Sequence, residues 1–122
     1  MLKNLTIVLD NRPGTLAAAC EAIGQARVNI EGMCCFASQG VAILYVAVQD
    51  SAATRRAVER IGLRVSEERD VVAVPVENQP EAAGRIFRQI AHADINLELA
   101  YLATGPRLVI GTSDSEKVRA LF

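Results

Sequence analysis

The sequence repeats itself at an offset of 67 residues, and this repeat constrains the fold more than any other feature. The shift places Pro13 on Pro80 and Asn29 on Asn96 without a gap. Self-similarity held in one register over such a length is the mark of a duplicated structural unit. The further identical pairs are Asn11 with Asn78, Ile23 with Ile90, Ala26 with Ala93, Glu31 with Glu98, and Ile43 with Ile110.

Each copy begins with a strand followed by an amphipathic helix. In the first copy, Leu5, Ile7 and Leu9 alternate as in a strand with one buried face. Pro13 is suited to the first turn of a helix, and apolar side chains then recur with helical spacing at Leu16, Ala19, Cys20 and Ile23.

After the helix, the spacing of apolar residues is again typical of β-strands. We expect strands at 28–36 and 41–48, and the apolar composition of the second predicts a central position. Gly40 supplies a positive φ for the turn between them. Asp50 and Ser51 are expected to cap a second helix whose buried side includes Ala53, Ala57, Val58 and Ile61, and Gly62 ends it before a strand at 63–65.

The second copy repeats this order but ends after its second helix. The expected elements are strands at 71–76, 95–103 and 107–112, a helix from Pro80 to His92, and a helix opened by Ser113 and Asp114. The fold class is therefore α+β, with two ferredoxin-like βαββαβ units at 1–69 and 70–122 and helices on one face of antiparallel sheets. The last strand of the second unit is absent from the sequence, which leaves an open edge unless that strand lies outside this chain.

Composition excludes several classes of function. Lys and Arg number 13 against 14 Asp and Glu, and aromatic residues make up 4% with no Trp, so neither the charge nor the stacking surface of a nucleic-acid-binding protein is present. The longest apolar run, Val41 to Val48, is far shorter than the roughly 20 residues of a membrane span. With no signal-peptide pattern and an odd number of cysteines, we expect a cytoplasmic protein without membrane association.

The sequence offers no recognisable catalytic or metal-binding motif. Cys34 and Cys35 are neighbours on a predicted strand and point to opposite faces, so they are expected to be structural rather than metal ligands. His92 has no partner spaced to form a triad, and its place near a helix end predicts a surface residue. We expect no enzyme activity, no cofactor and no metal.

Two motifs resemble the ACT family of amino-acid-binding regulatory domains. Asp10-Asn-Arg-Pro-Gly-Thr-Leu16 is similar to the acid-x-x-Pro-Gly-x-Leu turn of that family. Val28-Asn-Ile-Glu31 is similar to its Val/Ile-Asn-Ile signature. With the duplication, the whole chain resembles stand-alone tandem ACT proteins that carry no catalytic domain. The resemblance implies a module that binds an amino acid and regulates a partner protein.

The turn before the first helix is the predicted ligand site. Unpaired N–H groups of a helix's first turn favour an anion such as an α-carboxylate, and Gly14 adds no Cβ in their way. The alternative is an ordinary turn capped by Asn11 or Asp10. Asn29 could likewise bind a zwitterion or only its own backbone. The candidate residues are Asp10, Asn11, Pro13, Gly14, Thr15, Leu16, Asn29 and Ile30, while Glu31 and Glu98 are expected to be solvated.

The second copy departs from the motif. Glu81 stands where the first copy has Gly14, and Leu16 is replaced by Ala83. A glutamate at this position adds a Cβ and a negative charge beside a ligand carboxylate. We therefore expect a weaker second site at most, built from Glu77, Asn78, Asn96 and Leu97.

These observations favour a regulatory module that binds an amino acid without catalysing a reaction, and the open edge predicts a homodimer. One alternative is a small enzyme on the same scaffold, because ferredoxin-like folds host unrelated functions. For an acyl-phosphate hydrolase, Arg12 is a phosphate-binding candidate with no second residue to support it. The other alternative is a purely structural oligomerisation module. The sequence does not identify the amino acid or the partner.

Overall fold

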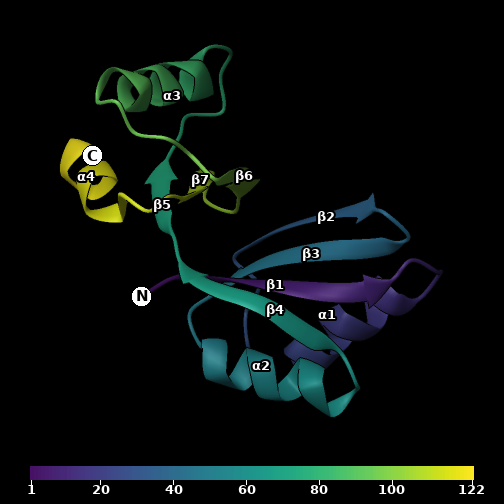
Figure 1. Ribbon diagram of the computed structural model, residues 1–122. Helices are drawn as coiled ribbons and strands as arrows, with labels where there is room; N and C mark the ends of the chain where they lie inside the picture. The colour runs from purple at the N-terminus through teal and green to yellow at the C-terminus, as the bar shows by residue number, and fades with distance from the viewer. The chain divides into compact units, whose positions relative to one another are not determined.

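The computed structural model describes all 122 residues, and they form two compact units, Met1–Arg69 and Asp70–Phe122. Each unit combines strands with helices, so the chain is α+β (Figure 1). Unit 1 contains β1 (Lys3–Asp10), α1 (Thr15–Gln25), β2 (Gly32–Ser38), β3 (Val41–Val48), α2 (Ser51–Arg60) and β4 (Arg64–Asp70), whose last residue begins unit 2. Unit 2 contains β5 (Val72–Pro75), α3 (Ala82–His92), β6 (Leu99–Ala103), β7 (Arg107–Gly111) and α4 (Ser115–Leu121).

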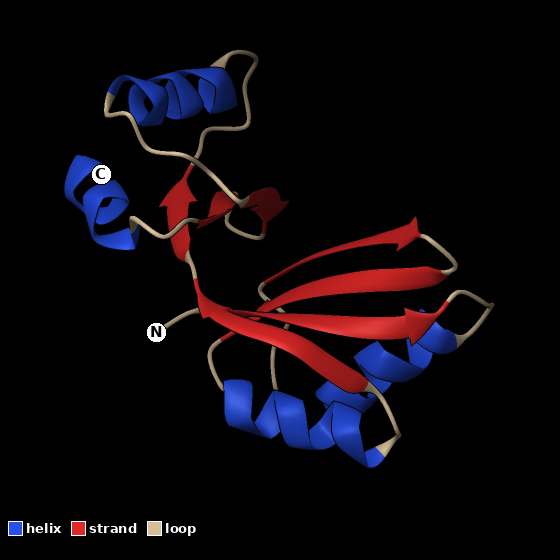
Figure 2. Ribbon diagram, in the orientation of Figure 1, coloured by secondary structure: helices blue, strands red, loops and turns tan.

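The strands of unit 1 lie in the order β4-β1-β3-β2. β3 pairs antiparallel with both β1 and β2, which confirms the central position predicted from its apolar composition. The register runs from Lys3 opposite Val48 to Asp10 opposite Val41. Both α1 and α2 cover the same face of this sheet (Figure 2).

The core of unit 1 lies between that face and the two helices. Leu5, Ile7 and Leu9 are almost completely buried, as their alternation predicted, and they pack with Ile23 of α1 and Val58 of α2. Burial of a side chain of this size stabilises the fold by about 1.5–3 kcal/mol. The aliphatic core therefore fixes the position of α1 on the sheet, and with it the turn that precedes α1.

Unit 2 repeats this arrangement with three strands, in the order β6-β7-β5. Val72 and Val74 of β5 pack with Ile90 of α3 and Val118 of α4 in a second aliphatic core. Each of these four side chains is at most 8% exposed. No helix in the chain is long and apolar enough to cross a membrane.

The third elements of both units begin later than predicted. β2 begins at Gly32 rather than at residue 28, and β6 begins at Leu99 rather than at residue 95. Arg27 and Asp94 have positive φ values of 64° and 59°, so the chain reverses direction after each helix. It then crosses the end of the unit before it can pair with the sheet. Val28, in this crossing segment, packs against the core outside the strand ladder.

The helix starts also differ from the prediction. α1 begins at Thr15, so Pro13 precedes the helix instead of lying in its first turn. Neither Asp10 nor Asn11 caps it, because the N-cap residue is Gly14. The same shift moves Pro80 outside α3.

Two apolar side chains expected in the core of unit 1 are exposed rather than buried. Leu16 is 37% exposed because it lies in the first turn of α1, and Ile61 is 46% exposed because it follows the last residue of α2. The predicted N-cap of α2 is confirmed: an Asp50 carboxylate oxygen accepts a hydrogen bond from the Ala53 N–H at 3.0 Å.

Candidate functional site

The turn between β1 and α1 is held by its own hydrogen bonds. The Thr15 hydroxyl donates to the carbonyl oxygens of Asp10 and Arg12 at 2.8 and 3.1 Å. The Arg12 N–H also donates to the Asp10 carbonyl at 3.0 Å. These bonds close the turn directly in front of the helix, so the first N–H groups of α1 lie beside Asp10 and Arg12.

The backbone conformation of this turn favours glycine at position 14, whereas the space around it does not demand glycine. Its φ of 91° lies in the left-handed region, and a Cβ built on it would meet no atom within 4 Å. An L-residue pays about 1–2 kcal/mol for that conformation. As glycine has no side-chain acceptor, no side chain caps α1, and the first turn keeps N–H groups that a carboxylate could bind.

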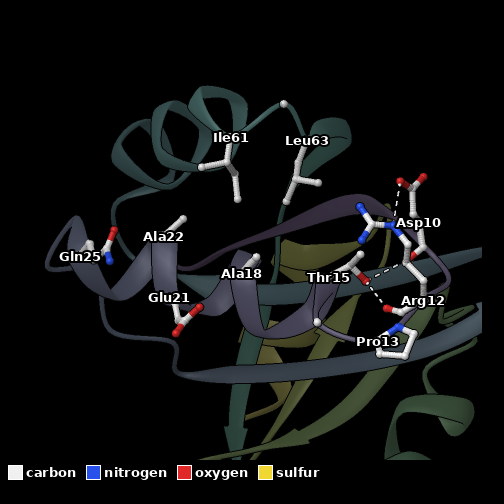
Figure 3. A pocket seen from close by; sticks show the side chains of 12 residues that line it. Asp10, Arg12, Pro13, Thr15, Ala18, Glu21, Ala22, Gln25, Ile61 and Leu63 are labelled. Carbon is white, nitrogen blue, oxygen red and sulfur yellow. Dashed lines mark hydrogen bonds and ion pairs between the residues drawn. The ribbon is translucent and has the colours of Figure 1, made fainter.

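A pocket of about 540 Å³ opens beside this turn, between α1 and the segment that follows α2 (Figure 3). Its floor is formed by the α1 face that carries Ala18 and Ala22, and Ile61 and Leu63 point toward that face from the opposite side. The lining residues are Asp10, Arg12, Pro13, Gly14, Thr15, Ala18, Glu21, Ala22, Gln25, Ile61, Gly62 and Leu63.

Charges of both signs lie at the turn end of the pocket. The Arg12 Nε atom is 3.7 Å from a carboxylate oxygen of Asp10, and the two side chains are 68% and 78% exposed. An ion pair this exposed contributes little to stability. Both charged groups are therefore open to a ligand that carries its own ammonium and carboxylate.

The structure brings together four of the predicted ligand residues: Asp10, Pro13, Gly14 and Thr15 all line the pocket. Asn11 and Leu16 flank the turn and are exposed, but neither lines the pocket.

Asn29 and Ile30 lie elsewhere in unit 1. Asp10 pairs with Val41 at one end of β3, whereas Glu31 donates its N–H to Ala47 near the other end, at 2.9 Å. The strand between these positions is about 20 Å long. Asn29 is exposed, and Ile30 packs against the core of unit 1 rather than bordering the pocket.

Sequence reasoning missed the side of the pocket away from the turn. Ala18, Ala22 and Gln25 recur with helical spacing and so share one face of α1, which is a signal that the sequence does contain. Ile61 and Leu63 carry no such signal, because the sequence pattern predicts Ile61 on the buried side of a helix and Leu63 at the start of a strand. From the sequence, Arg12 is named only as a phosphate-binding candidate.

Unit 2 has its own pocket of about 440 Å³ beside the turn before α3. Glu77 and Asn78 line it, but Asn96 and Leu97 do not. The Asn96 carbonyl accepts a hydrogen bond from the Thr112 hydroxyl at 2.7 Å, and Leu97 packs against the core. The lining residues are Val76, Glu77, Asn78, Gln79, Ala83, Leu102, Ala103 and Pro106.

Glu81 holds the same strained conformation as Gly14. It is the N-cap of α3 with a φ of 72°, in the left-handed region that L side chains rarely adopt. We expect Glu81→Gly to raise the free energy of unfolding by about 1 kcal/mol, measured by urea denaturation. Gly14→Ala is the matched control and should lower it by a similar amount. A destabilised Glu81→Gly variant would contradict this reading of the turn.

The cysteines and the histidine offer no second centre. The pKa of the Cys20 thiol is raised mainly by burial and to a smaller extent by the nearby Cys35. The pKa of Cys35 is likewise raised mainly by burial and then by Cys34. Both thiols therefore favour the neutral form, which is unreactive. No group of three or more potential metal ligands occurs in the chain. His92 is exposed in the last turn of α3.

Comparison with solved structures identifies the fold. A protein from Bacteroides thetaiotaomicron matches with a TM-score of 0.83 at 24% sequence identity, covering 98% of this chain and 84% of that one. The regulatory subunit of aspartate kinase from Thermus thermophilus matches with a TM-score of 0.74 at 17% identity, over 98% and 89% of the two chains. The corresponding subunit from Thermus flavus gives 0.70 at 16% identity, over 98% and 90%.

No protein-family model matches the sequence, and no curated protein matches it. The structural likeness extends over almost the whole chain at low identity, so it concerns the backbone arrangement rather than particular side chains. The chain has the fold of the aspartate kinase regulatory subunits.

Proposed function

We propose that the chain is a tandem ACT-type regulatory module that binds an amino acid in unit 1 and has no catalytic activity of its own. The observation that carries this proposal is the pocket beside Gly14, where an exposed carboxylate, an exposed guanidinium and an uncapped helix start meet. The fold shared with regulatory subunits of aspartate kinase supports it. We place the two ACT-like units at 1–69 and 70–122.

The charges of the pocket complement a zwitterion. The ligand carboxylate would bind the Arg12 guanidinium and the N–H groups at the start of α1, next to Gly14, where the helix is positive. The ammonium would bind Asp10. The ligand's side chain would then lie against Ile61 and Leu63, which favours an aliphatic amino acid.

Asn29 can contribute to the same ligand only from a second copy of the chain. Within unit 1 it lies at the end of the sheet opposite to Asp10, beyond the reach of one amino acid. We therefore propose a homodimer in which ligand binding favours one packing of the subunits. A regulated partner protein would respond to that change. We also propose that the protein is cytoplasmic.

A thermal-shift screen of the twenty amino acids tests the proposal. We expect a small set of aliphatic amino acids to raise the melting temperature, because a ligand at 100 times its Kd adds about 2.7 kcal/mol to the stability of the folded state. The shift should disappear in Asp10→Asn, which removes the charge that binds the ammonium. If no amino acid stabilises the protein, or if Asp10→Asn responds like the wild type, the pocket does not have this function.

A further inference from the structure

We infer that the pocket of unit 2 binds an aliphatic primary amine that carries no carboxylate. This inference goes beyond the amino-acid site proposed for unit 1. It is argued from the unit 2 pocket itself: its lining charges, its apolar wall, and the positions at which it differs from unit 1.

The two turns differ in which half of a zwitterion they can bind. At the 67-residue offset, Asp10 corresponds to Glu77 and Asn11 to Asn78, so an acid and an amide are kept. The start of α3 is uncapped like that of α1, but two other features that favour an anion are lost. Arg12 is replaced by Gln79, and the glycine at the helix start is replaced by Glu81.

The formal charge of the pocket lining is therefore negative. Glu77 is the charged residue among the eight that line it, and Asn78 and Gln79 add amide oxygens that can accept hydrogen bonds from an ammonium group. No basic side chain lines the pocket. On the neighbouring segments, Arg107 donates to Thr104, and Arg85 forms an exposed ion pair with Glu81 at 3.6 Å. A carboxylate in this pocket would meet Glu77 without a cation to offset it.

The rest of the pocket is apolar and of a size for a small molecule. Val76, Leu102 and Pro106 contribute to its walls, and Leu102 is 64% exposed. An aliphatic chain bound in this pocket of 440 Å³ would remove apolar surface of Leu102 from water, which favours binding. The Val76 N–H is bonded to the Pro106 carbonyl at 3.2 Å, so the β6–β7 hairpin is held against the turn. An amine with a short branched hydrocarbon chain would pair its ammonium with Glu77 and place its hydrocarbon against the apolar walls.

Titration of the full-length chain with 3-methylbutylamine and with leucine, followed by NMR of the backbone amides, tests the inference. The two probes share one hydrocarbon skeleton and differ by the carboxylate. We expect the amine to shift the signals of Glu77, Asn78 and Leu102 saturably. Glu77→Gln, which preserves side-chain size at an exposed position, should weaken this binding about tenfold to a hundredfold. The matched variant Asp10→Asn should leave it unchanged.

Each alternative result has a distinct meaning. Amine binding that survives Glu77→Gln with unchanged affinity, or that shifts residues 10–15 instead, overturns the inference. So does leucine binding at Glu77 with the same affinity as the amine. Amine binding at Glu77 together with failure of every amino acid to bind near Gly14 would support this inference while overturning the function proposed for unit 1.

Discussion

Replacing Gly14 with glutamate is expected to abolish amino-acid binding by unit 1 while the unit remains folded. The new side chain places a negative charge where the ligand carboxylate would bind, and an L-residue at a φ of 91° strains the turn by about 1–2 kcal/mol. Space is not the obstacle, because a Cβ there meets no atom within 4 Å. Calorimetry with the amino acid selected by the thermal-shift screen measures the loss.

Two matched variants separate charge from backbone strain. Gly14→Asn is neutral and tolerates the left-handed region, so it should retain weakened binding that Gly14→Glu lacks. Glu81→Gly changes the equivalent position of unit 2 and should leave the affinity of unit 1 unchanged. Full binding by a folded Gly14→Glu protein would show that the ligand carboxylate is not placed at this turn. Two sites of equal affinity for the amino acid would equally contradict the placement.

Truncation of Leu44 to alanine should cause a large loss of stability in unit 1. Leu44 is fully buried in the central strand β3, opposite Ile7 of β1. Removing a buried leucine side chain costs about 3–5 kcal/mol, because the lost apolar burial adds to the cavity left behind. Domains of this size have only about 5–15 kcal/mol to lose. Urea denaturation followed by circular dichroism provides the measurement.

Leu102→Ala is the control for this substitution, since it makes the same chemical change at a side chain that is 64% exposed. Its free energy of unfolding should stay within about 0.5 kcal/mol of the wild type. Similar losses in the two variants would show that Leu44 is not part of a well-packed core. The difference between them therefore reports core packing rather than leucine chemistry.

The sequence by itself determined those features that depend on neighbouring residues. The alternation of Leu5, Ile7 and Leu9 decided which face of β1 is buried, since successive side chains of a strand point to opposite faces. The cap at Asp50 and the positive φ of Gly40 were likewise predictable, because both depend on the chemistry of one turn. For the same reason, the turn residues Asp10, Gly14 and Thr15 could be predicted to lie together, and they line one pocket.

The tertiary structure alone decided where β2 begins and what completes the site. β2 starts at Gly32 because pairing with β3 is possible only after the chain has crossed the end of the unit. Ile61 joins a pocket that begins about 50 residues earlier in the chain, because the packing of α2 beside α1 brings it there. Asn29 was separated from Asp10 by the length of β3. These outcomes depend on contacts between segments distant in sequence, which local pattern and composition do not encode.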